Sequence, residues 1–70
     1  MKRVNEKIYC EVSFCYLIGI EKRSGYVITH WWNDFYKRFE RILYDDLISE
    51  YKEKVAIYLY IKTSLARYSH

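Results

Sequence analysis

Hydrophobic and polar residues alternate with period two over residues 8–20. One parity of this run is apolar throughout: Ile8, Cys10, Val12, Phe14, Tyr16, Ile18 and Ile20. Such alternation predicts a half-buried β-strand. At about 3.3 Å per residue the run is longer than so small a domain is wide. We therefore expect the strand to bend or to carry a bulge, near Ser13 or at Gly19.

A polar segment over residues 21–25 separates this run from a second apolar one. It ends in Gly25, which adopts a positive φ without steric cost, so it predicts a hairpin loop. Residues 26–31 are β-branched and aromatic, which favours a short second strand.

Residues 33–54 change to helical spacing. Asn33 is a favourable N-cap and Asp34 suits a first helical turn, while Thr29 is an alternative cap that would bring Trp32 into the helix. The apolar stripe of the predicted amphipathic helix consists of Phe35, Phe39, Ile42, Leu43, Leu47 and Tyr51.

Period two returns over residues 55–61 and predicts a third strand. The predicted fold is a single α+β domain over residues 1–70 with the element order ββαβ. A right-handed crossover through the helix makes strands two and three parallel, with strand one between them. The result is a three-stranded antiparallel sheet in spatial order 2-1-3, with the helix on one face. Its predicted core is Phe14, Phe39, Leu43, Ile57 and Leu59.

The second face of this predicted sheet has no element to cover it. It is expected to carry Tyr9, Glu11, Ser13, Cys15, Leu17, Tyr58, Tyr60, Lys62 and one parity of the second strand. Tyrosine is enriched at protein interfaces because it offers a large, stiff surface with a polar end. Tyr9, Tyr58 and Tyr60 therefore predict a surface that binds another protein or a second copy of the chain.

The charges of the predicted helix run against its dipole. Basic residues occupy its first half and acidic residues its second, whereas the dipole favours the reverse. Such a layout suits a partner of complementary charge. The predicted partner-binding residues are thus Tyr9, Tyr58, Tyr60, Lys62, Arg38, Arg41, Asp45 and Asp46.

Composition supports a folded chain with a mild positive charge. Hydrophobic residues make up 51%, and the net charge is +3. That charge is small for a dedicated nucleic-acid-binding domain. Tyrosines on an open sheet beside basic residues still suit the stacking of single-stranded nucleic acid, which is the alternative function. The basic residues concerned are Lys62, Lys22, Arg23, Lys2 and Arg3, and Glu11 on the same face counts against it.

Residues with the spacing of a catalytic or metal site are lacking. His30 and His70 are the only histidines, and no glycine-rich phosphate loop is present. Cys10 and Cys15 fall on opposite faces of the predicted strand, so we expect free thiols. We therefore expect no enzyme activity, no metal and no cofactor.

The apolar runs are shorter than the 18 to 20 residues of a membrane span, and the N-terminal residues do not form a signal peptide. We accordingly expect a cytoplasmic protein without membrane contact. The absence of proline and the scarcity of glycine suit the coding bias of phages and mobile elements. A short chain of this kind is expected to be an inhibitor or adaptor, such as an antagonist of a host enzyme or defence complex.

Overall fold

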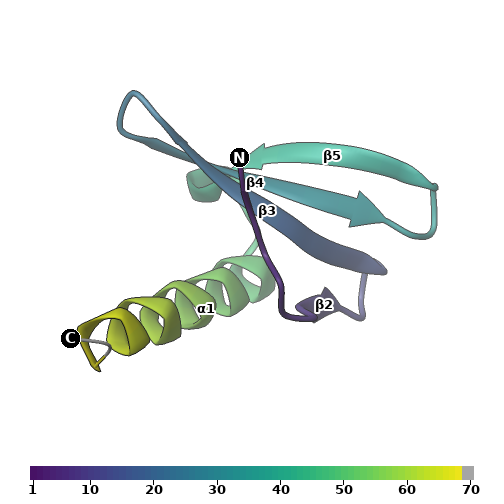
Figure 1. Ribbon diagram of the computed structural model, residues 1–70. Helices are drawn as coiled ribbons and strands as arrows, with labels where there is room; N and C mark the ends of the chain where they lie inside the picture. Colours follow the sequence, from purple (N-terminus) through teal and green to yellow (C-terminus); the bar gives the residue numbers. More distant parts are fainter. Residues whose placement is uncertain (69–70) are drawn as a thin grey trace.

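The computed structural model describes the backbone of residues 1–68 and the side chains of residues 1–62. Within these residues the chain forms an antiparallel sheet followed by one α-helix (Figure 1). The elements are β1 (Lys2–Arg3), β2 (Tyr9–Cys10), β3 (Cys15–Arg23), β4 (Tyr26–Asn33), β5 (Arg38–Leu43), the 3-10 turn η1 (Tyr44–Asp46) and α1 (Ser49–Tyr68). The lateral strand order is β1-β3-β4-β5, and β2 also pairs with β3.

The α+β class is confirmed, but the ββαβ order and the three-stranded 2-1-3 sheet are wrong. The segment predicted as one helix over residues 33–54 contains a turn, β5, η1 and only the start of α1. The predicted third strand over residues 55–61 lies inside α1. Pairing with β4 overrides the helical spacing of Phe39, Ile42 and Leu43 and makes residues 38–43 a strand. The alternation over residues 55–61 also fits a helical period, and packing of Tyr51, Val55 and Tyr58 against the sheet makes that segment part of a helix.

The long apolar alternation over residues 8–20 is broken at the two predicted places. A turn over residues 11–14 separates β2 from β3, and the register of β3 shifts between Leu17 and Gly19. At each break the parity of the inward-facing residues changes. Cys10 points inward before the turn, Cys15 and Leu17 point inward after it, and Ile20 points inward after the register shift. The predicted hairpin loop is also confirmed, because β3 and β4 meet at a turn in which Gly25 has φ 82°.

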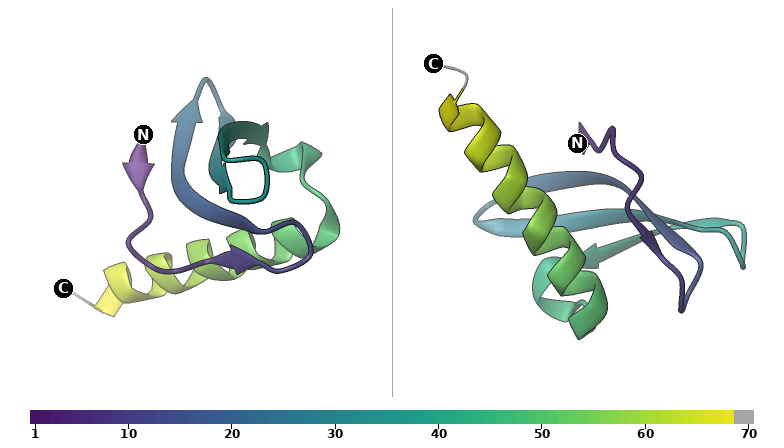
Figure 2. Two further views of the ribbon diagram at one scale, coloured as in Figure 1. Left: turned by 90° about the vertical axis from the view of Figure 1, so that its right-hand side faces the viewer. Right: turned by 90° about the horizontal axis from the view of Figure 1, so that it is seen from below.

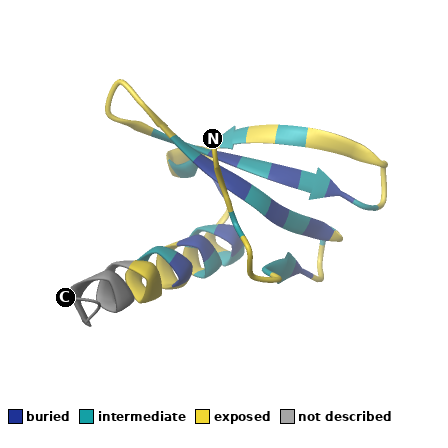
Figure 3. Cartoon of the chain, viewed as in Figure 1, coloured by how far each residue is buried: buried dark blue, intermediate teal, exposed yellow. Residues whose placement is uncertain are grey.

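The core lies between α1 and the inward face of β3 and β4 (Figures 2 and 3). Its centre is Trp31, which has no exposed surface. The Trp31 indole N–H donates to Thr29 Oγ1 at 2.7 Å, and its ring centroid lies 4.8 Å from that of Tyr51. The Thr29 hydroxyl in turn donates to the Ile42 carbonyl of β5 at 2.7 Å. Trp31 thus connects the helix to the middle of the sheet.

The predicted core is wrong. Phe14, Phe39, Leu43 and Ile57 are exposed, and Leu59 is half-buried. The inward positions are taken instead by Cys10, Cys15, Leu17, Ile20, Trp31, Leu47, Tyr51, Val55 and Tyr58. Phe14 is outward because the turn over residues 11–14 interrupts the strand on which its inward position was based. The other four were assigned inward positions on a helix over residues 33–54 and a strand over residues 55–61, neither of which the structure forms.

Candidate functional site

Three exposed aromatic side chains meet at one end of the sheet, where the β2–β3 and β4–β5 turns lie together. They are Phe14, Phe35 and Tyr36, called here the tip cluster, with exposed fractions of 48%, 66% and 61%. The Phe14 and Phe35 rings are stacked with centroids 6.1 Å apart, and the Tyr36 ring meets Phe35 edge-on at 4.9 Å. The Arg38 guanidinium lies 4.8 Å from the Tyr36 ring centroid, within the range of a cation–π contact.

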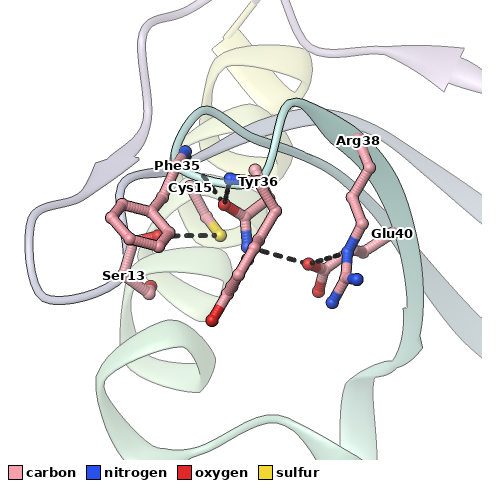
Figure 4. Close-up of polar contacts among 7 residues, drawn as sticks. Ser13, Cys15, Phe35, Tyr36, Arg38 and Glu40 are labelled. Atoms are coloured by element: carbon pink, nitrogen blue, oxygen red, sulfur yellow. Dashed lines mark hydrogen bonds and ion pairs between the residues drawn. The ribbon is translucent and has the colours of Figure 1, made fainter.

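The side chain of Asn33 holds the turn that carries two of these rings, Phe35 and Tyr36, which Figure 4 shows beside Arg38 and Glu40. Its side chain is nearly buried, and Oδ1 accepts the backbone N–H groups of Phe35 and Tyr36, each at 3.0 Å. Its Nδ2 donates to Glu40 Oε1 at 2.8 Å, and the same oxygen accepts Arg38 Nε at 3.3 Å. Asn33 was predicted to cap a helix. It does cap consecutive N–H groups, but those of an Asx turn between β4 and β5.

The backbone of the tip is fixed at two further points. The Asp34 N–H donates to the Phe14 carbonyl at 2.9 Å and so ties the two turns together. Phe14 and Lys37 have φ values of 56° and 53°, a left-handed conformation that bulky residues rarely adopt. Such conformations cost about 1–3 kcal/mol each and persist only where surrounding contacts hold them. They concentrate at functional positions, which makes the tip a candidate site.

The charges of the tip are paired within the chain. Lys37 Nζ lies 2.8 Å from Asp34 Oδ1, and the Trp32 indole N–H donates to the same oxygen at 3.2 Å. The bonds from Lys37 and then from Trp32 hold the pKa of Asp34 below its ordinary value. With Arg38 bound to Glu40, the tip presents aromatic surface with little net charge.

The sheet face turned away from α1, called here the outer face, carries a second aromatic group. Cross-strand pairing places one residue from each of four strands side by side in a row: Tyr9, Tyr16, Trp32 and Phe39. Ring centroids are 4.6 Å apart for the first pair and 4.8 Å apart for the last. Phe39, at 74% exposed, stands out furthest, and the other three are half-buried.

A polar contact lies beside this row. Glu21 Oε1 is 3.1 Å from His30 Nε2, and Glu21 Oε2 is 2.7 Å from an Arg23 nitrogen. The hydrogen bond with His30, assisted by the charge of Arg23, lowers the pKa of Glu21 against the opposing effect of burial.

This contact is expected to make the fold sensitive to acid. Because the folded-state pKa of Glu21 lies below its ordinary value of 4.5, the stabilisation is present above that pH and is lost as the pH falls through the folded-state pKa. Glu21→Gln removes this ionisation, so the decline of unfolding free energy below the same pH should be shallower than in the wild type. Urea unfolding measured at a series of acidic pH values tests this. Identical decline in both proteins would contradict it.

The structure separates the residues that the sequence grouped as a binding site. Tyr9 lies on the outer face, as expected, whereas Tyr58 and Tyr60 lie on α1, where Tyr58 is buried and Tyr60 is exposed. Lys62, also on α1, lies 3.5 Å from a Glu6 carboxylate oxygen. Tyr58 and Tyr60 therefore do not extend the outer face.

The four charged residues predicted to bind a partner through the helix lie in β5 and η1. Arg38 joins the tip cluster, and Arg41 lies in β5 opposite His30. Asp45 and Asp46 are exposed in η1. The argument from the helix dipole does not apply, because none of these four residues lies in an α-helix.

The rings of the tip cluster were missed because Phe35 was placed on a helix and Phe14 in the core. One signal in the sequence identifies the turn. Asn33-Asp34 directly after the β-branched and aromatic run of residues 26–31 is typical of a turn closed by its own side chains.

The two cysteines face each other, contrary to the prediction that they lie on opposite faces. Cys10 is the cross-strand neighbour of Cys15 because the turn over residues 11–14 reverses the chain between them. Both are buried free thiols, and burial raises the pKa of Cys10 to about 11. That pKa makes Cys10 a poor nucleophile near neutral pH.

Comparison with protein families, with curated proteins and with solved structures found no match. Among the described residues, no helical segment combines the length and the apolar character that crossing a membrane requires. Within the same residues, no group of three or more His, Cys, Asp or Glu side chains has the arrangement of a metal site.

Proposed function

We propose that this chain is a non-enzymatic protein-binding module of the cytoplasm that acts as an inhibitor or adaptor and docks through its tip cluster. The observation that carries the proposal is the combination of exposure and rigidity at Phe14, Phe35 and Tyr36. Contiguous exposed aromatics on a small protein typically mark an interaction surface. Rings fixed before binding lose little conformational entropy when a partner surrounds them.

The geometry favours insertion into an apolar pocket of the partner. Aromatic and arginine side chains are the residues that most often dominate binding energy at protein interfaces, and Arg38 lies against the Tyr36 ring at the edge of the cluster. Since the charges of the tip are paired within the chain, we expect the complex to persist at high salt.

The class of partner that we propose is a host enzyme or defence complex opposed by a phage or mobile element. This part of the proposal is supported by composition, which lacks proline and is poor in glycine. Self-association through the tip is the competing outcome, and it is recognised by a sedimentation velocity measurement on the purified chain.

The proposal is tested by affinity capture from the native host followed by quantitative mass spectrometry. Three forms are compared: the wild type, Phe35→Ser with Tyr36→Ser, and Tyr60→Ser as a control at an exposed aromatic of α1. We expect proteins retained by the wild type and by Tyr60→Ser at high salt to be reduced about tenfold or more by the tip variant, because two anchors at an interface each contribute about 2 kcal/mol. Circular dichroism verifies that all three are folded. Equal retention by the tip variant and the wild type would refute the proposal.

A further inference from the structure

The outer face combines aromatic and basic residues in adjacent rows. The aromatic row of Tyr9, Tyr16, Trp32 and Phe39 crosses the sheet from β2 to β5. The next row consists of Arg3, Gly19, His30 and Arg41, which are cross-strand neighbours from β1 to β5. Successive residues on one face of a strand are about 6–7 Å apart, so along β4 and β5 the basic row lies one such step from the rings.

Positive charge dominates this face. Lys7 Nζ lies 5.9 Å from the centroid of the Tyr16 ring, and Arg3, Arg23 and Arg41 point outward from their strands. Glu21 is the only acidic residue among the outward-facing positions of the described strands. Its two carboxylate oxygens are already bound by His30 and Arg23. Asp34 also reaches the aromatic row, where it accepts the Trp32 indole N–H, but it is paired with Lys37. Among the described residues, Arg3, Arg41 and Lys7 form no ion pair with a carboxylate.

Gly19 contributes no side chain to the middle of the basic row. A Cβ atom at this position would approach the Met1 side chain to 2.6 Å and the Lys2 carbonyl to 2.9 Å. The absence of a side chain lets β1 lie close to β3, which brings Arg3 into the same sheet as His30 and Arg41. A glycine where two backbones approach closely is a recurrent device in strands.

We propose that the outer face binds single-stranded nucleic acid, with bases stacked on the aromatic row and phosphates bound by Arg3, Arg41 and Lys7. An open sheet that offers rings beside cations binds unpaired bases because every base has a stacking face. A duplex hides those faces, so the single strand is the ligand that this surface favours. The proposal is independent of the protein-binding function assigned to the tip cluster.

The test is fluorescence anisotropy with a labelled oligothymidylate of about 12 nucleotides, enough to cross one such platform. We expect saturable binding at about 50 mM salt that weakens as salt rises, with a slope of log K against log salt of about −2, as about three phosphate contacts imply. Phe39→Ala should weaken binding about 5- to 150-fold, the range that one stacked base implies, without changing the slope. Arg41→Ala should make the slope shallower by about 0.7.

Matched controls separate this surface from the tip cluster. Phe35→Ala removes a comparably exposed phenylalanine of the tip and should bind the oligonucleotide like the wild type. Phe39→Ala should behave like the wild type in the capture of protein partners. Four results would overturn the proposal: no binding at about 50 mM salt, binding that does not depend on salt, equal affinity for a duplex of the same length, or Phe39→Ala indistinguishable from Phe35→Ala.

Discussion

Trp31→Ala is expected to lower the free energy of unfolding by about 3–5 kcal/mol, whereas Trp32→Ala at the next position costs much less. Trp31 is wholly buried and touches Tyr51 of α1, while Trp32 is half-buried on the outer face. Replacing a buried tryptophan by alanine costs about 3–5 kcal/mol. A domain of this length has about 4–10 kcal/mol of stability in total, so the loss is a large part of it.

Urea unfolding followed by far-UV circular dichroism checks this pair. The matched control Trp31→Phe retains an aromatic ring against Tyr51 but loses part of the indole volume and the N–H that donates to Thr29, so its midpoint should lie between those of Trp31→Ala and the wild type. A Trp31→Ala protein that unfolds cooperatively near the wild-type midpoint would show that α1 does not pack over the middle of the sheet.

Asn33→Ala is expected to lower the free energy of unfolding by about 2–3 kcal/mol and to abolish partner capture by the tip cluster. The change removes the acceptor for the Phe35 and Tyr36 N–H groups and leaves Glu40 without one of its donors. Leaving a buried polar group without its partner costs about 1–3 kcal/mol. Without Asn33 the turn loses the contacts that fix its left-handed residue Lys37.

A pair of substitutions distinguishes the turn from the contact with Glu40. Asn33→Asp keeps an oxygen in the position that accepts both N–H groups but sets a second carboxylate against Glu40. Adding Glu40→Gln restores a donor to that contact, so the double variant should recover most of the stability and of the partner capture. If Asn33→Ala matches the wild type in both urea unfolding and capture, Asn33 does not hold the tip.

The hairpin of β3 and β4 was predictable because its signals are local. A polar segment ending in Gly25 favours a tight turn, and the β-branched and aromatic residues that follow favour a strand. Over residues 33–61, local sequence signals do not select between helix and strand. Phe35, Phe39, Ile42 and Leu43 match a helical stripe, and only pairing with β4 makes residues 38–43 a strand. Tertiary contacts of this kind override local periodicity.

The candidate site was predictable in its chemistry but not in its position. An open sheet face with aromatic residues was expected and is present, but only Tyr9 of the expected tyrosines lies on it. Tyr58 is buried against the sheet because residues 51, 55 and 58 form a helical stripe that a strand-like alternation concealed. Asn33 was predicted to cap a helix that the structure does not form, and it caps a turn instead. Its bond to Glu40 depends on the pairing of β4 with β5, which the sequence alone does not show.

The rigidity of the tip cluster before any partner binds is tested most directly by amide hydrogen exchange, measured by NMR on the isolated chain. The Phe35 and Tyr36 amides are bonded to Asn33 Oδ1 although their side chains are exposed, so both should exchange much more slowly than the amide of Gly25 in the β3–β4 turn. Asn33→Ala should bring the two rates close to that of Gly25. Exchange of Phe35 and Tyr36 in the wild type as fast as that of Gly25 would contradict a preorganised binding surface.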